Sequence, residues 1–506
     1  MGTDEAGRAI IGTCSHCGAS LRLHAPAFPV APPRQAGAIA ILFALLLIPL
    51  IAICGFAIDL AMLYNRKAEM RNVAHAVALA AAKKLNGTAA GVSDAVSAAA
   101  SVAALQKFNY YKETVTWSSA ALTFSSKPDR HGSWTDATGA AADAARVYYV
   151  KVDTEKLDPA GTIQTALMRV ISSSFNSLQA NSEIIAGRTS IDIAPLAICA
   201  MSAAPATRRN NSASNAELVE YGFRRGVSYN LMDLNPAGTD ALNFLVNPLA
   251  APGTSGQPSD FAPSTVGPYA CTGSLGIPRV TGDPISVSPA FPLGALYKQL
   301  NARFDQYDNG QCTAHGALPD ANIKSYSYTD MALPTGWVTI APLTQAAAAI
   351  VSDGKRQTIA DLPPATGTAN QYGTLWAYAK AVPYAAYSAG VAEPSAGYPT
   401  FTTASWAVMY GGQTVKAYPP GSATPYKSGA SSNSAKPAAN HAPGLRNRRV
   451  LNVALLSCAA TPSTTANVLA VAKFFMTVPA TSTALAAEFA GTIPLERISG
   501  NVQVFP

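Results

Sequence analysis

Charged residues are scarce in this chain of 506 residues, where Asp, Glu, Lys and Arg make up 13%, against about 25% in an ordinary globular domain. With 49% hydrophobic residues, the composition excludes charge-driven disorder over most of the length. The net charge of +7 is spread out, and no run of five or six basic residues occurs. Nucleic-acid binding needs clustered Lys and Arg with interleaved aromatic residues, so we predict no nucleic-acid partner.

The sequence also lacks the common motifs of catalysis. It contains no GxSxG nucleophile elbow, HExxH pair, phosphate loop or GxGxxG fingerprint. Of the six histidines, only His131, His315 and His441 lie in the long region after residue 100, and no local pattern pairs them with a nucleophile. We therefore predict no catalytic residue, no cofactor and no enzymatic activity.

Charge is absent altogether between Arg34 and Asp59. The apolar run from Gly37 to Ile58 has 22 residues. A helix of that length covers about 33 Å, enough to cross a hydrocarbon core of about 30 Å. Pro49 lies inside the run and removes one backbone hydrogen bond, so we expect a kink there. The sequence predicts one transmembrane helix, with Arg34 and Asp59 at the interfaces.

The length of this apolar run disfavours two other interpretations, a cleaved signal peptide and a buried helix of a soluble protein. A cleaved signal peptide fits the small-x-small pattern at residues 55–57, but its apolar region would be too long. A soluble core helix would not stay apolar over such a length.

The orientation in the membrane is a separate question. The basic residues Arg66, Lys67 and Arg71 follow the run and favour a cytoplasmic C-terminus, although large domains translocate with little regard for such charges. Cysteine usage favours the opposite orientation, with the bulk in the periplasm.

Residues 1–33 are expected to form a cytoplasmic tail that carries a CxxCG turn at Cys14 and Cys17. Two thiolates on one tight turn are half of a zinc site, and a second CxxC pair is missing. His16 and His24 are poor substitutes at their spacings. Cys14 and Cys17 are therefore metal candidates only if a partner chain completes the site; the alternative is an unstructured tail.

Helical spacing continues beyond the apolar run. The apolar residues on one side of this continuation are Leu63, Met70, Val73, Val77 and Ala81. Asn86 and Gly87 supply a stop signal. The sequence predicts one long rod that leaves the membrane and offers an apolar stripe to a partner helix or to its own domain.

The segment from residue 34 to 85 resembles the N-terminal domain of TadG-like proteins, members of the TadE/TadG family of Flp (Tad) pilus assembly. The matching features are Arg34 and Gly37 in an Arg-x-x-Gly lead-in, the apolar span, Asp59 at its end, Tyr64 with Arg66, and the Ala-rich run 78–82. The resemblance implies an envelope assembly protein whose partners are the inner membrane, TadE/TadF-like proteins, and the pilus platform or pilin.

Two positions depart from the pattern of that family. His75 stands where the Ala-rich block usually has Asp, and Leu42 stands where prepilin-type cleavage after Gly37 would want Glu. We therefore expect an anchored component of the machinery rather than a processed pilin.

The predicted fold class is α+β: a single N-terminal transmembrane helix that continues into a juxtamembrane helix, then a mixed extracytoplasmic region with long loops. The expected parts are the tail 1–33, an anchor 34–87 with its span at 37–58, a small α/β unit 88–190 and a C-terminal α+β domain 191–506. In the small unit we predict a helix at 92–107, β-prone pieces at 114–124, a strand at 146–153, helical spacing at 162–171 and an extended segment at 182–193. In the C-terminal domain we predict strands at 191–199, 228–233, 450–458 and 468–478 and a helix at 293–307.

Seven cysteines occur, two in the tail, Cys54 in the span and four downstream. The downstream residues Cys199, Cys271, Cys312 and Cys458 allow two disulfides in three pairings. Cys199 and Cys458 each end a predicted strand and could face one another, which would leave Cys271 to pair with Cys312. Bridges contribute about 2–4 kcal/mol each and indicate an oxidising compartment. The alternative is four buried thiols in a cytosolic domain.

The sequence is consistent with three functional hypotheses. The first is a non-enzymatic assembly component of a Flp pilus or related secretion system, anchored in a bacterial inner membrane. The second is an adhesin-like ectodomain, but the strand at 190–200 runs into Ala-Pro-Leu where a von Willebrand A metal site needs DxSxS, and Ser352-Asp353-Gly354 alone cannot hold Mg²⁺. The third is a tethered enzyme, which needs His, Asp and Ser residues that converge in a pocket.

Overall fold

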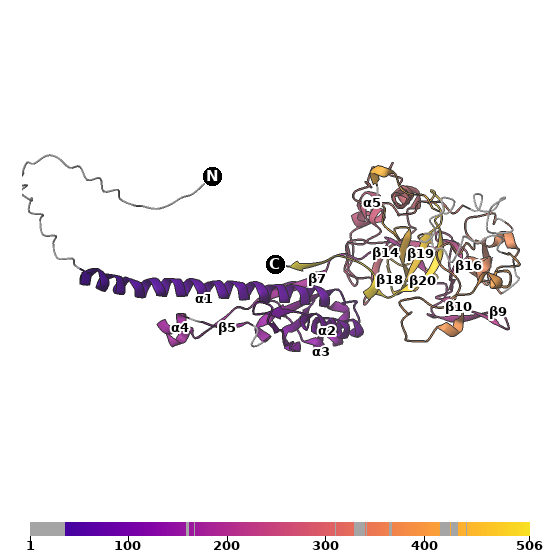
Figure 1. Cartoon of the computed structure of the whole chain (residues 1–506). Coiled ribbons are helices and arrows are strands. Elements are labelled where there is room, and N and C mark those ends of the chain that lie inside the picture. The colour runs from indigo at the N-terminus through magenta and orange to yellow at the C-terminus, as the bar shows by residue number, and fades with distance from the viewer. Residues whose placement is uncertain are drawn as a thin grey trace, which may run out of the picture. The chain divides into compact units, whose positions relative to one another are not determined.

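The computed structural model describes residues 36–505, apart from 158–160, 166, 309, 328–339, 341, 364–366, 415–425, 427–433 and 442. The tail 1–33 with its CxxC pair, and Arg34, lie outside the described residues. The chain divides into two compact units, Met1–Leu60 with Thr165–Asn176, and Ala61–Gln164 with Ser177–Pro506. The predicted fold class is confirmed: a long apolar N-terminal helix precedes a mixed region of helices and strands (Figure 1).

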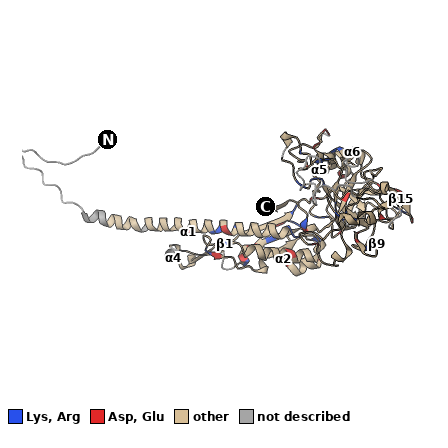
Figure 2. Ribbon diagram, turned by 45° about the vertical axis from the view of Figure 1, so that its right-hand side comes forward, with Lys and Arg blue, Asp and Glu red and all other residues tan. Residues whose placement is uncertain are grey.

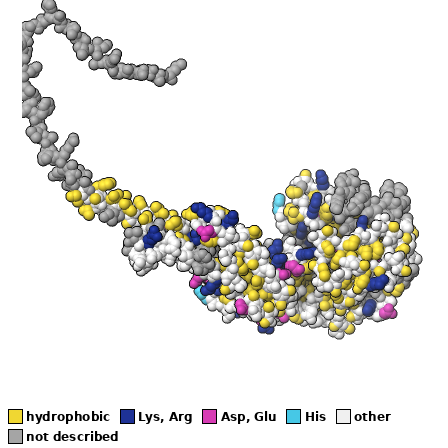
Figure 3. Space-filling view, turned by 60° about the horizontal axis from the view of Figure 1, so that its bottom comes forward, with side chains coloured by type: hydrophobic (Ala, Val, Ile, Leu, Met, Phe, Trp, Pro, Cys, Tyr) yellow, Lys and Arg dark blue, Asp and Glu magenta, His cyan; other side chains and the backbone are white. Residues whose placement is uncertain are grey.

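Helix α1 spans Ala36–Ala82, 47 residues, and continues through Pro49. It is the one helix in the described part of the chain that is long and apolar enough to cross a membrane. The ribbon of its first half carries no charge colour in Figure 2, and hydrophobic side chains cover its described start in Figure 3. The large apolar side chains between residues 41 and 58 are 38–71% exposed, except for Ile48, whose side chain is not described.

The second half of α1 packs on its own domain, one of the two possibilities that the sequence left open. Its buried face carries Met70, Val73, Val77 and Ala81, each at most 1% exposed. These residues share a hydrophobic core with the helices α2 (Ala89–Ala103) and α3 (Ala137–Ala142) and with the small sheet. The small sheet has the order β21-β7-β4-β3 and is antiparallel throughout.

The strands of the small sheet come from both ends of the sequence. Their bounds are β3 Leu122–Ser125, β4 Tyr149–Asp153, β7 Glu183–Arg188 and β21 Val502–Phe505. The extended segments predicted at 146–153 and 182–193 are therefore strands, although both are shorter than expected. The last strand of the chain closes one edge of this sheet by pairing with β7.

The helical spacing predicted at 162–171 is wrong for its first part. Strand β5 (Thr162–Gln164) pairs with β6 (Ser177–Gln179), and helix α4 is confined to Met168–Ile171. Thr162 and Ile163 are β-branched and favour an extended backbone once a partner strand is present. The local pattern contained no information about that partner, which lies beyond the turn.

Residues 191–499, here called the large body, are built around an eight-stranded sheet with the order β12-β20-β19-β17-β8-β13-β14-β18. The strands are β8 Leu196–Cys199, β12 Ser228–Asn230, β13 Asn243–Val246, β14 Ile285–Pro289, β17 Val450–Leu456, β18 Thr465–Ala466, β19 Val468–Met476 and β20 Ala486–Ile493. All pairs are antiparallel except β8 with β17.

Both faces of this large sheet are covered. Successive residues of β8 point to opposite faces, so Leu196 and Ile198 belong to one hydrophobic core while Ala197 and Cys199 belong to another. Helices α5 (Pro263–Thr272) and α6 (Leu293–Leu300) contribute buried residues. The helix predicted at 293–307 is α6 followed by the 3₁₀ turn Asn301–Phe304.

Several elements of the large body were not predicted. They include the sheet β11-β10-β9, formed by β9 Thr207–Ser212, β10 Asn215–Glu220 and β11 Phe223–Arg224, and the hairpin of β15 Ala349–Ser352 with β16 Lys355–Thr358. The Ser-Asp-Gly sequence considered for a metal turn forms this hairpin's tip. Asp353 and Gly354 have φ of +54° and +71°, the left-handed backbone of a tight two-residue turn.

Candidate functional site

The end of the apolar run is tied to the tip of the β5–β6 hairpin. Asp59 is 1% exposed, and its Oδ2 accepts hydrogen bonds from the backbone N–H of Leu167 at 3.0 Å and of Met168 at 2.7 Å. A Cβ on Gly55 would lie 2.5 Å from the Leu167 side chain, so this close approach requires glycine. Asp59 therefore holds a segment of its own chain.

Of the other residues predicted for the membrane anchor, two lie in α1 and one is outside the described residues. Gly37 lies in the first turn of α1, and Pro49 lies within its apolar half. Arg34 is outside the described residues, as are the metal candidates Cys14 and Cys17. Cys54 is an exposed free thiol on the apolar half of α1.

A second tie lies further along α1, at Glu69. Its carboxylate accepts the backbone N–H groups of Asn109 at 3.0 Å and of Tyr110 at 2.9 Å and pairs with Arg66 at 3.2 Å. Asn109, Tyr110 and Tyr111 all have φ between +53° and +62°, which is strained for residues other than glycine. The carboxylate offsets this strain by satisfying two of the turned backbone donors. Tyr110 and Tyr111 are 58% and 80% exposed, so the turn presents two tyrosines.

The four downstream cysteines are brought together as two disulfides. Cys199 at the end of β8 is bonded to Cys458, just after the neighbouring parallel strand β17, with Cα atoms 5.6 Å apart. Cys271 in α5 is bonded to Cys312, also at a Cα distance of 5.6 Å. The first bridge links parallel neighbours that are 259 residues apart in sequence, and the second closes a loop of 41.

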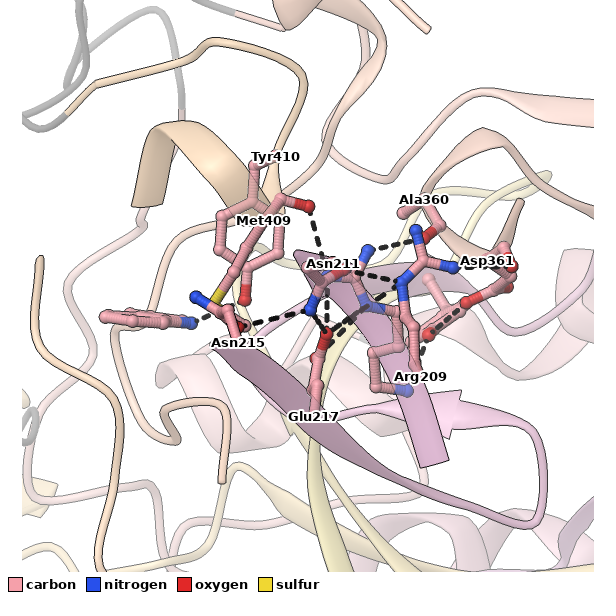
Figure 4. Close-up of polar contacts among 11 residues, drawn as sticks. Arg209, Asn211, Asn215, Glu217, Ala360, Asp361, Met409 and Tyr410 are labelled. Carbon is pink, nitrogen blue, oxygen red and sulfur yellow. Dashed lines mark hydrogen bonds and ion pairs between the residues drawn. The ribbon is translucent and has the colours of Figure 1, made fainter. Parts of the chain in front are cut away.

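A buried ion pair organises the unpredicted β9–β11 sheet (Figure 4). Glu217 is 0% exposed and pairs with Arg224 at 2.7 Å, and Arg224 Nη2 also donates to the Met409 carbonyl at 3.1 Å. Asn211 donates to the Glu217 carboxylate at 3.0 Å. Arg209 donates to the backbone carbonyl of Asp361 at 3.0 Å. The charged groups pair with one another across the three strands, and the two arginines also bind backbone carbonyls of the segments at 361 and 409, so the network acts as a structural joint.

This joint borders a cavity of about 390 Å³. Burial raises the pKa of Asp361, whose carboxylate accepts hydrogen bonds from Thr358 and Tyr229 at 2.8 Å each. The described lining contains no histidine, serine or cysteine that could serve as a nucleophile or base. Nor do the described residues contain a group of three or more His, Cys, Asp or Glu that could hold a metal ion.

Glu488 in β20 is a second fully buried carboxylate. Its Oε2 accepts the N–H of Ala377 at 3.0 Å, and its Oε1 accepts those of Tyr378 and Ala379 at 2.9 and 2.7 Å. Burial raises the pKa of Glu488 to about 7, although these three donors oppose the shift. The carboxylate fastens the irregular segment around Trp376 to the large sheet.

The stability of the large body should fall between pH 4.5 and about 7 because of Glu488. Its pKa rises on folding, so over this window the folded protein keeps a proton that the unfolded chain releases. Each unit corresponds to about 1.4 kcal/mol, so the total is on the order of 3 kcal/mol. In Glu488→Gln, which mimics the protonated acid, the thermal midpoint should fall less over this range than in the wild type. Parallel pH profiles of the two proteins would contradict the assignment.

Residues 37–84 match the Tad family model of TadE/G-like proteins of Flp pilus assembly. The N-terminal region is a TadE/G-like domain. The match covers the apolar half of α1 and the half that packs on the small sheet, and it confirms the resemblance drawn from the sequence. No curated protein and no solved structure matches the chain.

Proposed function

We propose that this protein is a non-enzymatic structural or assembly component of a bacterial Flp (Tad) pilus or a related secretion system. Its TadE/G-like helix anchors it in the inner membrane, and its disulfide-bonded bulk lies in the periplasm. Its partners are TadE/TadF-like proteins and the pilus platform or pilin. The tail 1–33 stays in the cytoplasm, and the anchor 34–87 precedes the small unit 88–190 and the C-terminal domain 191–506.

The observation that carries this proposal is the exposed apolar half of α1. Each large aliphatic side chain there gains about 1.5–3 kcal/mol when it moves from water to an apolar environment. The large apolar side chains described between residues 41 and 58 remain 38–71% exposed, so the fold itself leaves them open to lipid. The TadE/G-like match and the two disulfides support the same arrangement.

The exposed side of the second half of α1 is where we place contacts with other envelope proteins. Tyr64 is 66% exposed, and Ala61, Ala68 and Arg71 are exposed on the same side at spacings of three and four residues. Small residues with one aromatic side chain allow the close approach of another helix. The opposite side is already used, because its buried residues pack on the small sheet.

A reporter that is active only in the periplasm, fused to the C-terminus of this chain, should be active in the wild type. Leu46→Arg combined with Leu50→Arg should abolish both the activity and membrane retention, because each Arg at the centre of a span costs about 2.5–3.5 kcal/mol of insertion. The matched control is Leu105→Arg with Leu343→Arg, at positions 78% and 82% exposed outside α1. An inactive wild-type fusion would overturn the orientation, and full retention of the first variant would overturn the anchor.

A further inference from the structure

A basic cavity of about 570 Å³ lies in the large body. Its lining includes residues of the paired strands β17 and β19 and the C-terminal end of α5. That volume falls within the range of small-molecule sites. The cationic residues of its lining are Arg303, Arg446, Arg448, Lys473 and Arg497. Asp192 is the single carboxylate among the described lining residues. The lining therefore carries a strong excess of positive charge.

These cations lack a direct carboxylate partner within the described parts of the chain. None of the five forms a salt bridge there, since no described carboxylate oxygen lies within 4.0 Å of their charged nitrogens. Arg448 instead donates to the backbone carbonyls of Leu318 and Cys271 at 2.9 Å and of Thr272 at 2.5 Å. Carbonyl oxygens orient the guanidinium without cancelling its charge, so Arg448 is held in place as a cation.

Arg303 supplies the second observation that indicates a ligand. It is 1% exposed, and its Nη1 donates to the carbonyls of Ala270 at 2.9 Å and Leu300 at 3.2 Å. Its Nε is buried and has no hydrogen-bond partner among the described residues. Buried polar donors in native proteins are normally satisfied, so the unpaired Nε of this cavity-lining residue leaves an acceptor to be accounted for. Burial lowers the pKa of Arg303 and of Arg448, an effect that a bound anion would oppose.

The chemistry of the lining selects the class of ligand. Guanidinium groups present parallel N–H donors that match the oxygens of phosphate and carboxylate groups. Four of the five cations are arginines, and Tyr378 supplies an aromatic wall. Lys473 is also influenced by Glu393 and Glu220, which do not line the cavity, and Arg448 is influenced by Asp192 and Asp320.

We propose that this cavity is a binding site for a multivalent oxyanion whose charge is carried by phosphate or carboxylate groups. The proposal concerns the large body alone and does not depend on the membrane anchor or on a pilus.

Calorimetric titration of the full chain in a neutral detergent tests the proposal, with pyrophosphate and citrate as separate probes at low ionic strength. At least one probe should bind the wild type. Arg446→Gln combined with Arg497→Gln should weaken that binding roughly tenfold or more, because both side chains are exposed and bring charge to the lining. Arg497 donates one hydrogen bond, to the Glu393 carbonyl at 3.2 Å. The matched control is Arg130→Gln with Arg146→Gln, which removes equal charge from exposed positions outside the cavity.

Selective loss of binding in the cavity variant supports the site, and the probe that binds more tightly identifies its preferred group. The absence of binding of both probes to the wild type at millimolar concentration would overturn the proposal. Equal weakening in the cavity variant and the control would also overturn it, because the effect would then be one of net charge. Thermal unfolding of each variant without probe, with midpoints like that of the wild type, shows that the fold is intact.

Discussion

Arg449→Met is expected to destabilise the large body by more than about 3 kcal/mol, because several backbone carbonyls lose a charged donor at once. Arg449 is 0% exposed. Its guanidinium donates to four backbone carbonyls, those of Asn322 at 3.0 Å, Lys324 at 2.7 Å, Met476 at 3.0 and 2.7 Å, and Thr477 at 2.9 Å. A methionine fills similar space but removes all five of these hydrogen bonds, and the Thr477 carbonyl then keeps only its hydrogen bond from the Tyr326 N–H at 2.9 Å.

The aromatic surroundings of Arg449 add to the expected loss. The guanidinium carbon lies 4.4 Å from the ring centre of Phe304, 4.5 Å from that of Phe475 and 5.2 Å from that of Tyr326. Cation–π contacts of this kind contribute about 0.5–2 kcal/mol when they are desolvated. Arg449→Lys should recover part of the stability, because an ammonium group has three donors and cannot replace the planar fork.

Thermal unfolding of the detergent-solubilised chain measures this effect. The matched control is Arg446→Met, the same change three residues earlier at an exposed position. We expect a large fall in the midpoint for Arg449→Met, a smaller fall for Arg449→Lys and almost none for the control. Equal midpoints for Arg449→Met and the control would show that the guanidinium does not hold these segments together.

The long apolar helix α1 could be predicted from the sequence because its signal is local. An uninterrupted apolar run and the helical spacing after it both belong to one continuous element, α1, so no distant partner was needed. The strands β4, β7, β17 and β19 were found for the same reason, since alternating or continuous apolar residues mark them.

The buried charges could not be predicted in the same way. Glu217, Glu488 and Arg449 read as ordinary surface residues, yet each is 0% exposed. The acceptors and donors that make their burial possible lie up to 127 residues away, as for the Arg449 guanidinium with the Asn322 carbonyl. Local pattern carries no information about such partners, and an unpaired charge would be costly to bury.

The candidate sites also differ in how much of each can be recognised from local sequence. Four cysteines could be recognised as bridge candidates from their number and company, while their pairing depended on which strands lie side by side. The basic cavity is lined by residues from Asp192 to Ser499, and no segment of the chain contains a recognisable share of it. Convergence of this kind appears only when the fold is known.

Replacement of both Cys199 and Cys458 by alanine should lower the free energy of unfolding by about 5 kcal/mol, because the bridge restricts a very long loop in the unfolded chain. It closes 259 residues, against 41 for the second bridge. Since loop entropy grows as the logarithm of length, the first bridge should contribute about 1.5 kcal/mol more than the second. The double replacement of Cys271 and Cys312 is therefore the matched comparison.

Urea unfolding under oxidising and reducing conditions distinguishes the contribution of the bridges from that of the side chains. Under oxidising conditions, loss of Cys199–Cys458 should shift the midpoint further than loss of Cys271–Cys312. With excess dithiothreitol, the wild type should approach the stability of the variant that lacks all four cysteines, because the constraint on its unfolded state is then removed. A wild-type midpoint that is unchanged by the reductant at full reduction of the thiols would show that the bridges do not stabilise the large body, and would favour four buried thiols in a reducing compartment.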